Sequence, residues 1–461
     1  MFSKPVAHAV LLAGAALLSI GATRPDRPDP AWDAPHVRNP LLPGYFADPS
    51  IVHHDGRWYL YATIDPWGGD RLGLWQSADF RNWTFSTPDW PTKQAATSPS
   101  SNGSKVWAPS VVQGRNGRWY MYVSVGSEVW VGSAPHPAGP WRDAHGGKPL
   151  IPKAFAPAYH MIDAEAFVDD DGQAYLYWGS GLNWVNGHCF VVKLKPDMVT
   201  FDGTPKDITP AHYFEAPFLF KAGGLYYLTY SYGNTTKDTY QVRYATGASP
   251  LGPFTEAPNS PLLATDAARQ IISPGHHAIF RAGGRPFILY HRQGLPFPPP
   301  GDAVLRQIAV DALTIRTDGL LDRVRPTHDG ALIPGTAGHR TTGYAYRATA
   351  SGSADALHGP ARIADDNNAT LWRAPASGAS WIQADLGQVR TLKSSRLSPE
   401  DATRPYRLAL ESSRDGRHWQ TVTTAAMHSG SPITLPHPVR ARYLRLTFRD
   451  PAVGMFGWTI D

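Results

Sequence analysis

Three carboxylates are the strongest candidates for chemistry in this sequence: Asp48, Asp163 and Glu215. Each stands directly before a short apolar run with the pattern of a β-strand. Cleavage of a glycosidic bond needs one carboxylic acid that protonates the leaving oxygen and one carboxylate that activates water or attacks the sugar. A third negative charge nearby raises the pKa of the acid, because it disfavours the ionised form. The set therefore predicts a glycosidase, provided that the fold brings the three side chains together.

Each carboxylate also has a purely structural explanation. An Asp before Pro, as at Asp48, commonly begins a turn, while Asp163 could cap a turn and Glu215 could pair with a surface Arg. Taken singly, none of the three indicates catalysis. We interpret them, however, as recurring at one position of an internal repeat, and this recurrence favours a shared site.

The repeat consists of five strand-like segments, each preceded by a glycine and by a second apolar run. The segments follow one another at intervals of roughly 50 to 60 residues. Each unit is therefore expected to begin with a β-hairpin. The residues that align are Tyr59, Tyr120, Tyr175, Tyr227 and Phe287, after the glycines Gly56, Gly117, Gly172, Gly224 and Gly284.

A repeat of this length, built of short strands and Gly/Pro turns without long helical periodicity, is typical of a β-propeller, and five hairpins predict five blades. A β-sandwich could also hold five hairpins, but it would not need each to open with the same pattern. The innermost strands of a propeller begin at its axial channel, so residues far apart in sequence converge there. At this level we place Asp48, Ala108, Asp163, Glu215 and His276.

We expect five parts along the chain. Residues 1–22 have the layout of a secretory signal peptide, residues 23–38 are a Pro-rich tether, and residues 39–332 form the propeller. Residues 333–353, rich in Gly, Ala, Ser and Thr, predict a linker. Residues 354–461 contain strand candidates with two-residue alternation. The predicted fold class is all-β, a five-bladed propeller followed by a β-sandwich.

Composition limits the partners and the compartment. The net charge is only +5 and no run of Lys and Arg occurs, so nucleic acid is not an expected partner. The N-terminal layout predicts a secreted or periplasmic protein that is free of the membrane after signal cleavage, with a retained membrane anchor as the alternative. Cys189 is the only cysteine, so no intrachain disulfide can form, and we expect it to be a small buried apolar residue. We expect a monomer that binds an oligosaccharide or polysaccharide substrate.

The propeller resembles glycoside hydrolase family 43, the five-bladed enzymes that act on arabinose- and xylose-containing polysaccharides. The resemblance covers residues 39–330 and rests on a combination of motifs, at residues 46–50, 107–109, 161–165, 214–217 and 274–277. It implies that Asp48 is the general base and Glu215 the general acid. It also implies that Asp163 raises the pKa of the acid and orients it, and that the anomeric carbon is inverted.

The same resemblance implies roles for three further residues. Trp107 would form an aromatic wall for a sugar face, and Arg306 matches an arginine that contacts the substrate. His276 matches an axial histidine that contacts the substrate and lies at or near a metal, commonly calcium, so one calcium ion is expected on the propeller axis. The structural alternatives are a core Trp, a surface Arg and a hydrogen-bonded core His. The acidic stretch at residues 169–172 lies in a hairpin turn and lacks the later Glu of a calcium loop, so we interpret it as a solvated turn.

The C-terminal unit resembles coagulation-factor type C domains, which are discoidin-like jelly-roll sandwiches. The motifs lie at residues 363–366, 370–372, 381–387 and 413–419. The resemblance implies carbohydrate binding through one end of the sandwich and a structural calcium ion near residues 365–370. That family usually continues beyond the motif at residues 457–461 into a last strand, so either the chain stops short or another segment closes the sheet. No organic cofactor is expected.

These expectations converge on an exo-acting, inverting glycosidase of plant polysaccharides or oligosaccharides, an α-L-arabinofuranosidase or a β-xylosidase. A β-galactofuranosidase of the same fold is an alternative. The alternative of another class is a non-catalytic, carbohydrate-binding propeller, whose signature would be the loss of a carboxylate at the mouth. All three carboxylates are present, and no Gly-rich loop between a strand and a helix indicates a nucleotide site.

Overall fold

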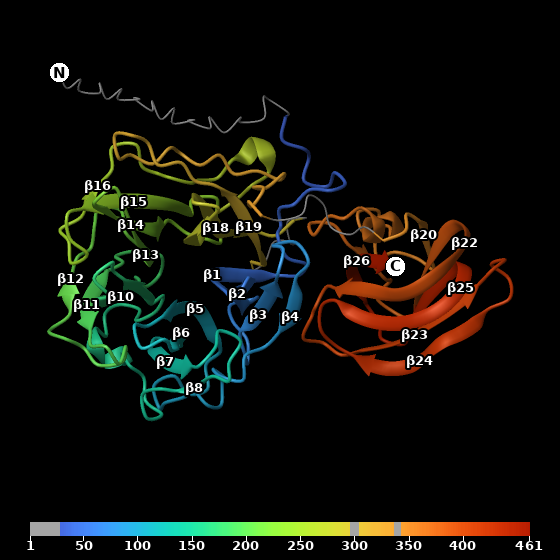
Figure 1. Ribbon diagram of the computed structural model, residues 1–461, viewed down its shortest axis with the longest axis horizontal. Helices are drawn as coiled ribbons and strands as arrows, with labels where there is room; N and C mark the ends of the chain where they lie inside the picture. The colour runs from blue at the N-terminus through green and yellow to red at the C-terminus, as the bar shows by residue number, and fades with distance from the viewer. Residues whose placement is uncertain (1–27, 296–303, 336–342) are drawn as a thin grey trace, which may run out of the picture.

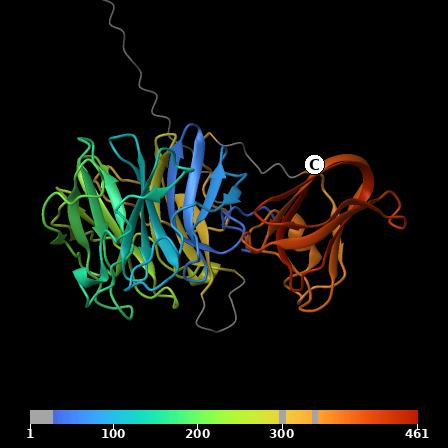
Figure 2. The same ribbon diagram turned by 90° about the horizontal axis from the view of Figure 1, so that it is seen from below.

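The computed structural model of the protein describes residues 28–295, 304–335 and 343–461. The signal peptide expected at residues 1–22 lies outside this part of the chain. The described residues form a ring of small sheets followed by a separate larger sheet (Figure 1), and Figure 2 shows the same two units from below. Helical structure within them is confined to the short 3-10 segments η1 (Lys153–Phe155), η2 (Ala267–Arg269) and η3 (Pro360–Ala364), and none of these is long enough to cross a membrane.

The ring consists of five antiparallel sheets, the blades of a β-propeller. The first strand of each blade contacts the first strands of both neighbouring blades, which places these five strands around the axis. The predicted all-β, five-bladed fold is therefore confirmed. Blade 1 contains β1 (Phe46–His54), β2 (Arg57–Ile64), β3 (Gly73–Ser77) and β4 (Thr84–Ser86); blade 2 contains β5 (Val106–Gln113), β6 (Trp119–Val125), β7 (Val129–Ala134) and β8 (Arg142–Asp143); blade 3 contains β9 (Glu165–Val168), β10 (Ala174–Trp178), β11 (Phe190–Leu194) and β12 (Lys206–Asp207); blade 4 contains β13 (Glu215–Ala222), β14 (Leu225–Tyr232), β15 (Gln241–Gly247) and β16 (Thr255–Glu256); blade 5 contains β17 (Gly275–Ala282), β18 (Arg285–Gln293) and β19 (Arg306–Ala312).

The five aligned aromatic residues occupy equivalent places, as predicted. Each lies on the second strand of its blade and faces an apolar residue of the first strand across the hairpin. The pairs are Val52 with Tyr59, Val112 with Tyr120, Phe167 with Tyr175, Phe220 with Tyr227 and Phe280 with Phe287.

Apolar side chains from neighbouring blades bury one another and hold the ring together. One cluster joins Tyr61 and Leu74 of blade 1 to Trp119, Met121 and Trp130 of blade 2. Because each sheet presents alternate side chains to opposite faces, one face of a blade packs on the blade before it and the other on the blade after it. This explains why the strands are apolar on both faces.

A kink at the start of the inner strands turns side chains toward the axis. At the beginning of the inner strand of each blade stands a non-glycine residue with a positive φ: Asp48 (51°), Ala108 (47°), Asp163 (56°), Ala216 (54°) and His276 (36°). The register of β1, β5, β13 and β17 shifts directly after this residue, which is the mark of a β-bulge. Left-handed backbone is costly for such residues and concentrates at functional sites.

The C-terminal unit is one folded-over sheet of seven strands: β20 (Arg347–Ala350), β21 (Trp372–Arg373), β22 (Ser380–Pro399), β23 (Tyr406–Ser413), β24 (Gln420–His428), β25 (Ile433–Phe448) and β26 (Gly454–Ile460). The two long strands β22 and β25 change register between Asp385 and Arg390, where the sheet bends. Trp372, Leu408 and Phe448 are fully buried between the two layers. The predicted β-sandwich is confirmed.

Two details of this unit bear on the expectations. The motif at residues 457–461 lies mostly in β26, which pairs with both β21 and β22, so this segment is itself a strand of the sheet. The linker is also shorter than the range expected from the sequence. β20 lies within the residues expected to form the linker but pairs with β22, so residues 347–350 belong to the sandwich.

The described part of the expected tether, residues 28–38, lies against both units rather than free. The Asp29 carboxylate accepts hydrogen bonds from the backbone N–H groups of His328 and Asp329. Arg362 of the sandwich donates to Asp33 at 3.1 Å. The segment is therefore part of the folded protein, in contrast to the expectation from its proline content.

The loop expected to hold a structural calcium ion, residues 365–370, makes an interface with the propeller. The side chain of Asn368 donates to the carbonyl oxygens of Pro40 (3.2 Å) and Leu41 (3.1 Å). Its own carbonyl accepts from Gln307 of β19 at 3.2 Å. The Asp365 carboxylate accepts from Thr370 Oγ1 at 2.7 Å. Burial raises the pKa of Asp365 to about 7, although the hydrogen bond from Thr370 opposes this shift. The polar groups named here are therefore already hydrogen-bonded to other protein groups. Calcium binding here stays a prediction.

Candidate active site

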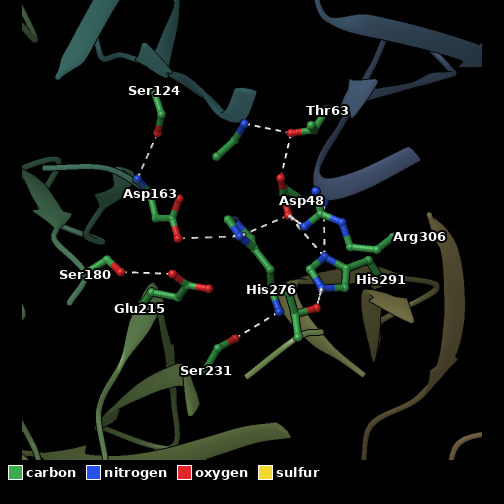
Figure 3. Close-up of polar contacts among 12 residues, drawn as sticks. Asp48, Thr63, Ser124, Asp163, Ser180, Glu215, Ser231, His276, His291 and Arg306 are labelled. Atoms are coloured by element: carbon green, nitrogen blue, oxygen red, sulfur yellow. Dashed lines mark hydrogen bonds and ion pairs between the residues drawn. The ribbon is translucent and has the colours of Figure 1, made fainter. Parts of the chain in front are cut away.

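The three candidate carboxylates converge, as their repeat positions predicted. Asp48 lies near the beginning of β1, Asp163 two residues before the start of β9, and Glu215 is the first residue of β13. Figure 3 shows their side chains pointing into one space on the axis, with the ring of His276 between those of Asp48 and Asp163. Three different blades thus supply one site.

Polar bonds between neighbouring blades fix the kinked residues. A hydroxyl on or next to the second strand of one blade accepts the backbone N–H of the kinked residue of the next blade. The bonds are Ala108 N to Thr63 Oγ1 (2.8 Å), Asp163 N to Ser124 Oγ (3.0 Å) and His276 N to Ser231 Oγ (2.9 Å). Between blades 3 and 4 the Asp163 carboxylate takes this role and accepts the N–H of Ala216. The carboxylates are therefore held by the same contacts that close the ring.

Glu215 does not share the repeat position of the other two carboxylates. Asp48 and Asp163 are the kinked residues of their blades, whereas the kinked residue of blade 4 is Ala216. Glu215 precedes it and corresponds to Trp107 in blade 2. The interpretation that all three stand at one repeat position was therefore wrong for Glu215, which lies one residue before the kinked position that the same bulge marks in β1, β5, β13 and β17. The acid reaches the same space from a neighbouring position.

Asp48 is a buried carboxylate surrounded by donors. Its Oδ1 lies 2.9 Å from Arg306 Nη1, 3.1 Å from His291 Nδ1 and 3.3 Å from His276 Nδ1. Its Oδ2 accepts a hydrogen bond from Thr63 at 2.7 Å. Burial alone would raise the pKa of Asp48, but the Arg306 charge and the two imidazoles outweigh it and hold the pKa well below its usual range. Asp48 is therefore ionised at any working pH.

The guanidinium of Arg306 is itself fixed by hydrogen bonds. Its Nε and Nη2 donate to the two carboxylate oxygens of Asp65, at 3.0 and 2.7 Å, while Nη1 reaches Asp48. The guanidinium lies 4.7 Å from the ring centre of Trp67. Its side chain is only 4% exposed, which excludes a surface role. A direct substrate contact by Arg306 stays a prediction, since the structure directs its donors to Asp48 and Asp65.

Glu215 and Asp163 lie in an environment that raises the pKa of a carboxyl group, in contrast to the environment of Asp48. Glu215 accepts from Tyr240 at 2.6 Å and from Ser180 at 2.9 Å. Burial raises the pKa of Glu215 to about 7, against these two hydrogen bonds and with help from the Asp48 charge. Burial and the negative charges of Glu215 and Asp48 likewise raise the pKa of Asp163. Because two such carboxyls resist double ionisation, the pair holds at least one proton near neutral pH.

His276 lies between the two kinds of carboxylate. Its Nδ1 is 3.3 Å from Asp48 Oδ1 and 3.6 Å from Asp163 Oδ2. Burial lowers the pKa of His276, with the Asp48 charge opposing it. Calcium prefers six to eight oxygen ligands. His276 would supply a single nitrogen, and Asp48 is already neutralised by Arg306, so water would have to complete the shell. Calcium at His276 stays a prediction.

A second cluster of metal-ligating side chains lies away from this site. The ligand atoms of His54, Asp55 and His136 all lie within 4.8 Å of one another, and among the described residues this is the one such group of three. The Nδ1 atom of His136, however, accepts the N–H of Ala138 at 3.0 Å, which leaves the proton of the neutral ring on Nε2. Nε2 then has no free lone pair for a metal, so the group fits a metal poorly.

Six further residues of the site lie outside the motifs identified in the sequence. They are Thr63, Asp65, Trp67, Ser180, Tyr240 and His291. Most follow the second strand of a blade or lie at its end, at the same end of the sheet as the carboxylates. A search of the segment after each aligned aromatic strand could have found them. Trp107 lies at this mouth too, with its ring centre 5.9 Å from that of His160, but its contact with sugar stays a prediction.

Comparison with known proteins agrees with this site. The chain matches the family model of glycosyl hydrolases family 43 over residues 37–321 and that of the F5/8 type C domain over residues 347–459. It is 35% identical over 281 residues to a β-D-galactofuranosidase of Aspergillus niger, covering 55% of this chain and 76% of that relative. It is 28% identical over 338 residues to an arabinoxylan arabinofuranohydrolase of Bacillus subtilis, covering 63% of this chain and 65% of that relative.

A solved structure agrees over nearly the whole chain. A protein described as a glycoside hydrolase superposes with a TM-score of 0.78 at 30% identity, covering 94% of this chain and 100% of the other. The rival interpretation, a non-catalytic propeller, requires the loss of a carboxylate that this site retains. The match in sequence extends over more than half of the chain, and the three carboxylates meet where the fold predicts. The chain therefore belongs to glycosyl hydrolases family 43 and is a glycosidase.

Proposed function

We propose that the protein is an exo-acting, inverting glycosidase that removes α-L-arabinofuranosyl or β-xylosyl units from arabinose- and xylose-containing plant polysaccharides or oligosaccharides. The observation that carries the proposal is the pair of opposite pKa shifts at one site. Arg306 holds the pKa of Asp48 well below its usual range, while burial raises that of Glu215 to about 7. Two carboxyl groups whose environments separate their pKa values in this way are suited to act as base and acid.

In this mechanism Asp48 accepts a proton from the water that attacks the anomeric carbon. Thr63 occupies one lone pair of Oδ2, so the same oxygen can still accept a water molecule. Glu215 donates its proton to the leaving oxygen as the glycosidic bond breaks. Asp48 ends protonated and Glu215 ionised, and exchange of protons with solvent restores both. Tyr240 and Ser180 hold the Glu215 carboxylate in place while it changes charge.

A second candidate is a β-galactofuranosidase. The relative from Aspergillus niger at 35% identity carries that activity in its name, and arabinofuranose and galactofuranose share the same ring. The catalytic residues proposed above serve either sugar. The two candidates differ in the sugar that fills the pocket and not in the chemistry.

The test is a panel of aryl glycosides together with the stereochemistry of one reaction. Turnover of an aryl α-L-arabinofuranoside or β-xyloside supports the leading proposal, and turnover of the aryl β-galactofuranoside alone supports the second. Proton NMR of the first-formed sugar then decides the mechanism. An anomeric configuration opposite to that of the substrate supports inversion. Retention would make Asp48 a nucleophile and overturn its assignment as base.

Three properties of the whole protein belong to the same proposal. We propose secretion on the signal-peptide layout of residues 1–22, a monomeric state, and a role for the sandwich in holding polysaccharide. N-terminal sequencing of the mature protein, light scattering, and a pull-down on insoluble arabinoxylan test them in turn. Calcium at His276 is tested by measuring activity and the melting temperature after dialysis against a chelator, with calcium added back.

A further inference from the structure

The loop between β10 and β11, residues 179–189, adjoins the acid Glu215. β9 begins at the mouth of the propeller, and β10 runs antiparallel to it, so the loop after β10 returns to the mouth. Ser180 of this loop donates to the Glu215 carboxylate at 2.9 Å. Its backbone N–H also donates to the carbonyl of His160, whose ring neighbours Trp107. The loop therefore forms the rim of the site on the side of the acid, and Figure 3 shows Ser180 of this loop beside Glu215.

Close backbone contacts fix both ends of the loop. A side chain at Gly181 would place its Cβ 1.9 Å from the carbonyl oxygen of Val185, and one at Gly187 would place it 2.0 Å from that of Phe214. Tyr213 donates to the carbonyl of Gly179 at 2.6 Å. Tyr213 and Phe214 directly precede Glu215, so the loop and the acid are held by the same short segment.

The tip of the loop is strained and exposes apolar side chains. Asn183, Trp184 and Asn186 have left-handed φ angles of 55°, 64° and 56°, which is rare for a tryptophan. Leu182 and Val185 are 45% and 54% exposed. The ring of Trp184 lies 5.5 Å from that of Phe214, tilted by 31°. Strain of this kind persists only where the surroundings enforce it, and it concentrates at ligand-binding segments.

The chemistry of the tip matches that of a sugar ring. Leu182 and Val185 offer an apolar surface to the C–H groups of the ring, and the exposed amides of Asn183 and Asn186 can donate to and accept from hydroxyl groups. Glu215 gives its proton to the leaving oxygen, so the neighbouring rim faces the part of the substrate beyond the bond that breaks. A rigid surface loses little freedom when it binds, which favours affinity.

We propose that residues 182–186 form the binding site for the pyranose unit on the leaving-group side of the scissile bond. This inference rests on the proposed function, since it takes Glu215 as the acid. The site selects glycosidic substrates whose leaving group is a sugar chain over those with a small alcohol. Leu182 and Val185 are specificity residues, and they touch the leaving group without taking part in bond cleavage.

The test compares two substrates that share the released sugar. Methyl α-L-arabinofuranoside has a leaving group too small to reach the loop, whereas arabinofuranosyl xylotriose has a sugar chain, and both leave as alcohols that need the acid. We expect the double variant Leu182→Ser, Val185→Ser to lower kcat/KM for the oligosaccharide by about tenfold, which corresponds to about 1.4 kcal/mol. The value for the methyl glycoside should stay within about twofold. An equal loss on both substrates, or no loss on either, overturns the proposal.

A matched control and a binding measurement separate this proposal from the proposed function. Leu225 and Leu332, outside the sandwich, are 37% and 53% exposed, and the variant Leu225→Ser, Leu332→Ser should leave both substrates unaffected. Calorimetric titration with xylotriose, the sugar chain alone, should show about tenfold weaker binding to the loop variant than to the unaltered protein. If the unaltered protein cleaves neither substrate but binds xylotriose through the loop, the proposed function fails and the loop assignment stands. If both proteins bind xylotriose equally, the loop assignment fails.

Discussion

Arg306 donates a hydrogen bond to Asp48 at 2.9 Å across 258 residues of sequence. The contact joins the last described strand of blade 5 to the first strand of blade 1, where the ring closes. Both side chains are nearly inaccessible to solvent, so the attraction between them is only weakly screened. One ion pair thus bridges the two blades that close the ring and also fixes the ionisation of the proposed base.

Weakening this pair should shift the pH profile. In Arg306→Lys the charge remains, but the planar fork that spans Asp48 and Asp65 is lost. The pKa of Asp48 then rises toward its usual value, and because the base must be ionised, activity is lost at a higher pH on acidification. We expect the acidic limb of kcat/KM to move up into the working pH range, where the titration of Asp48 does not limit the unaltered protein. The control Arg316→Lys, at an exposed pair with Asp318, should change nothing, and an unmoved limb in Arg306→Lys would argue against this role.

Replacement of the acid should depend on the leaving group. Glu215→Gln keeps groups that can hydrogen-bond Tyr240 and Ser180 but has no proton to give. Loss of a general acid typically costs a factor of about 10² to 10⁴ for leaving groups that need protonation. A 2,4-dinitrophenyl group departs without a proton, so that substrate should lose far less. Rates for a series of aryl glycosides, plotted against the pKa of the phenol, measure this, and an equal loss across the series contradicts the assignment.

Replacement of Asp48 should show no such dependence. Asp48→Ala removes the group that activates water, which every substrate needs, so turnover should be abolished whatever the leaving group. It also leaves Arg306 without one of its partners and therefore requires a check of the fold. A circular dichroism spectrum and melting temperature close to those of the unaltered protein would assign the loss to chemistry. Residual turnover of activated substrates alone would point to Glu215 and Asp48 having exchanged roles.

Asp163 should act through the proton that it and Glu215 hold together. In Asp163→Asn one negative charge is gone, so the ionised form of Glu215 becomes less unfavourable and its pKa falls below about 7. Because the acid must be protonated, the loss of activity as the pH is raised then begins at a lower pH than in the unaltered protein. We expect the alkaline limb of the pH profile to move down. A limb that stays in place would show that Asp163 acts by position alone.

The sequence predicted the repeat well because every blade needs the same hairpin. Tyr59 and its four equivalents pair across the hairpin as aligned. The register of the acid was missed, although the sequence marks it, because Pro49, Pro109 and Pro217 each directly follow the kinked residue and align Ala216 with Asp48. Ala216 carries the kink that Asp48 and Asp163 carry elsewhere. Sequence placed Glu215 at the right end of the right strand, but one position from its true equivalent.

The contacts between the propeller and the sandwich could not be predicted from the sequence. Proline content alone made residues 23–38 resemble a free tether, and a family pattern made residues 365–370 resemble a calcium loop. The partners of these segments are carbonyl and N–H groups far away in sequence, such as those of Leu41 and His328. Such contacts depend on how the two units dock, which no local pattern in the chain reveals.

The sandwich should stabilise the propeller through Asn368. Its side chain donates to the carbonyls of Pro40 and Leu41, and Leu41 in turn bonds Ile308 of the strand that begins with Arg306. Asn368→Ala leaves two buried carbonyl groups without a donor, which should lower the free energy of unfolding by about 2 kcal/mol. The control Asn82→Ala removes a hydrogen bond on the surface and should cost less than about 0.5 kcal/mol. Chemical denaturation of the three proteins measures both, and equal costs would mean that the interface is not a source of stability.

Glu165, two residues beyond Asp163, should make the protein less stable as the pH rises. Burial raises the pKa of Glu165 to about 8, although a hydrogen bond with Ser110 opposes the shift. Between its ordinary pKa of 4.5 and about 8 the folded protein holds a proton there that the unfolded chain has lost. The unfolded state therefore binds fewer protons in this window, so the contribution to stability falls as the pH rises through it. Below this window the group costs little, and above it the ionised carboxylate is fully penalised.

Glu165→Gln removes this titration while keeping the size and polarity of the side chain. We expect the variant to gain about 4 kcal/mol of stability relative to the unaltered protein between pH 5 and pH 9, as a pKa raised from 4.5 to about 8 requires. Urea unfolding at pH 5, 7 and 9 measures the difference, and the control Asp202→Asn, at an exposed carboxylate, should follow the unaltered protein throughout. Several buried carboxyls contribute to the total pH dependence, Asp311 among them with a pKa that burial raises to about 7. The decisive quantity is therefore the slope that the Glu165 variant loses relative to the control. If that slope is unchanged, Glu165 is ionised in the folded protein at neutral pH, and a cation or solvent on the axis must stabilise its charge.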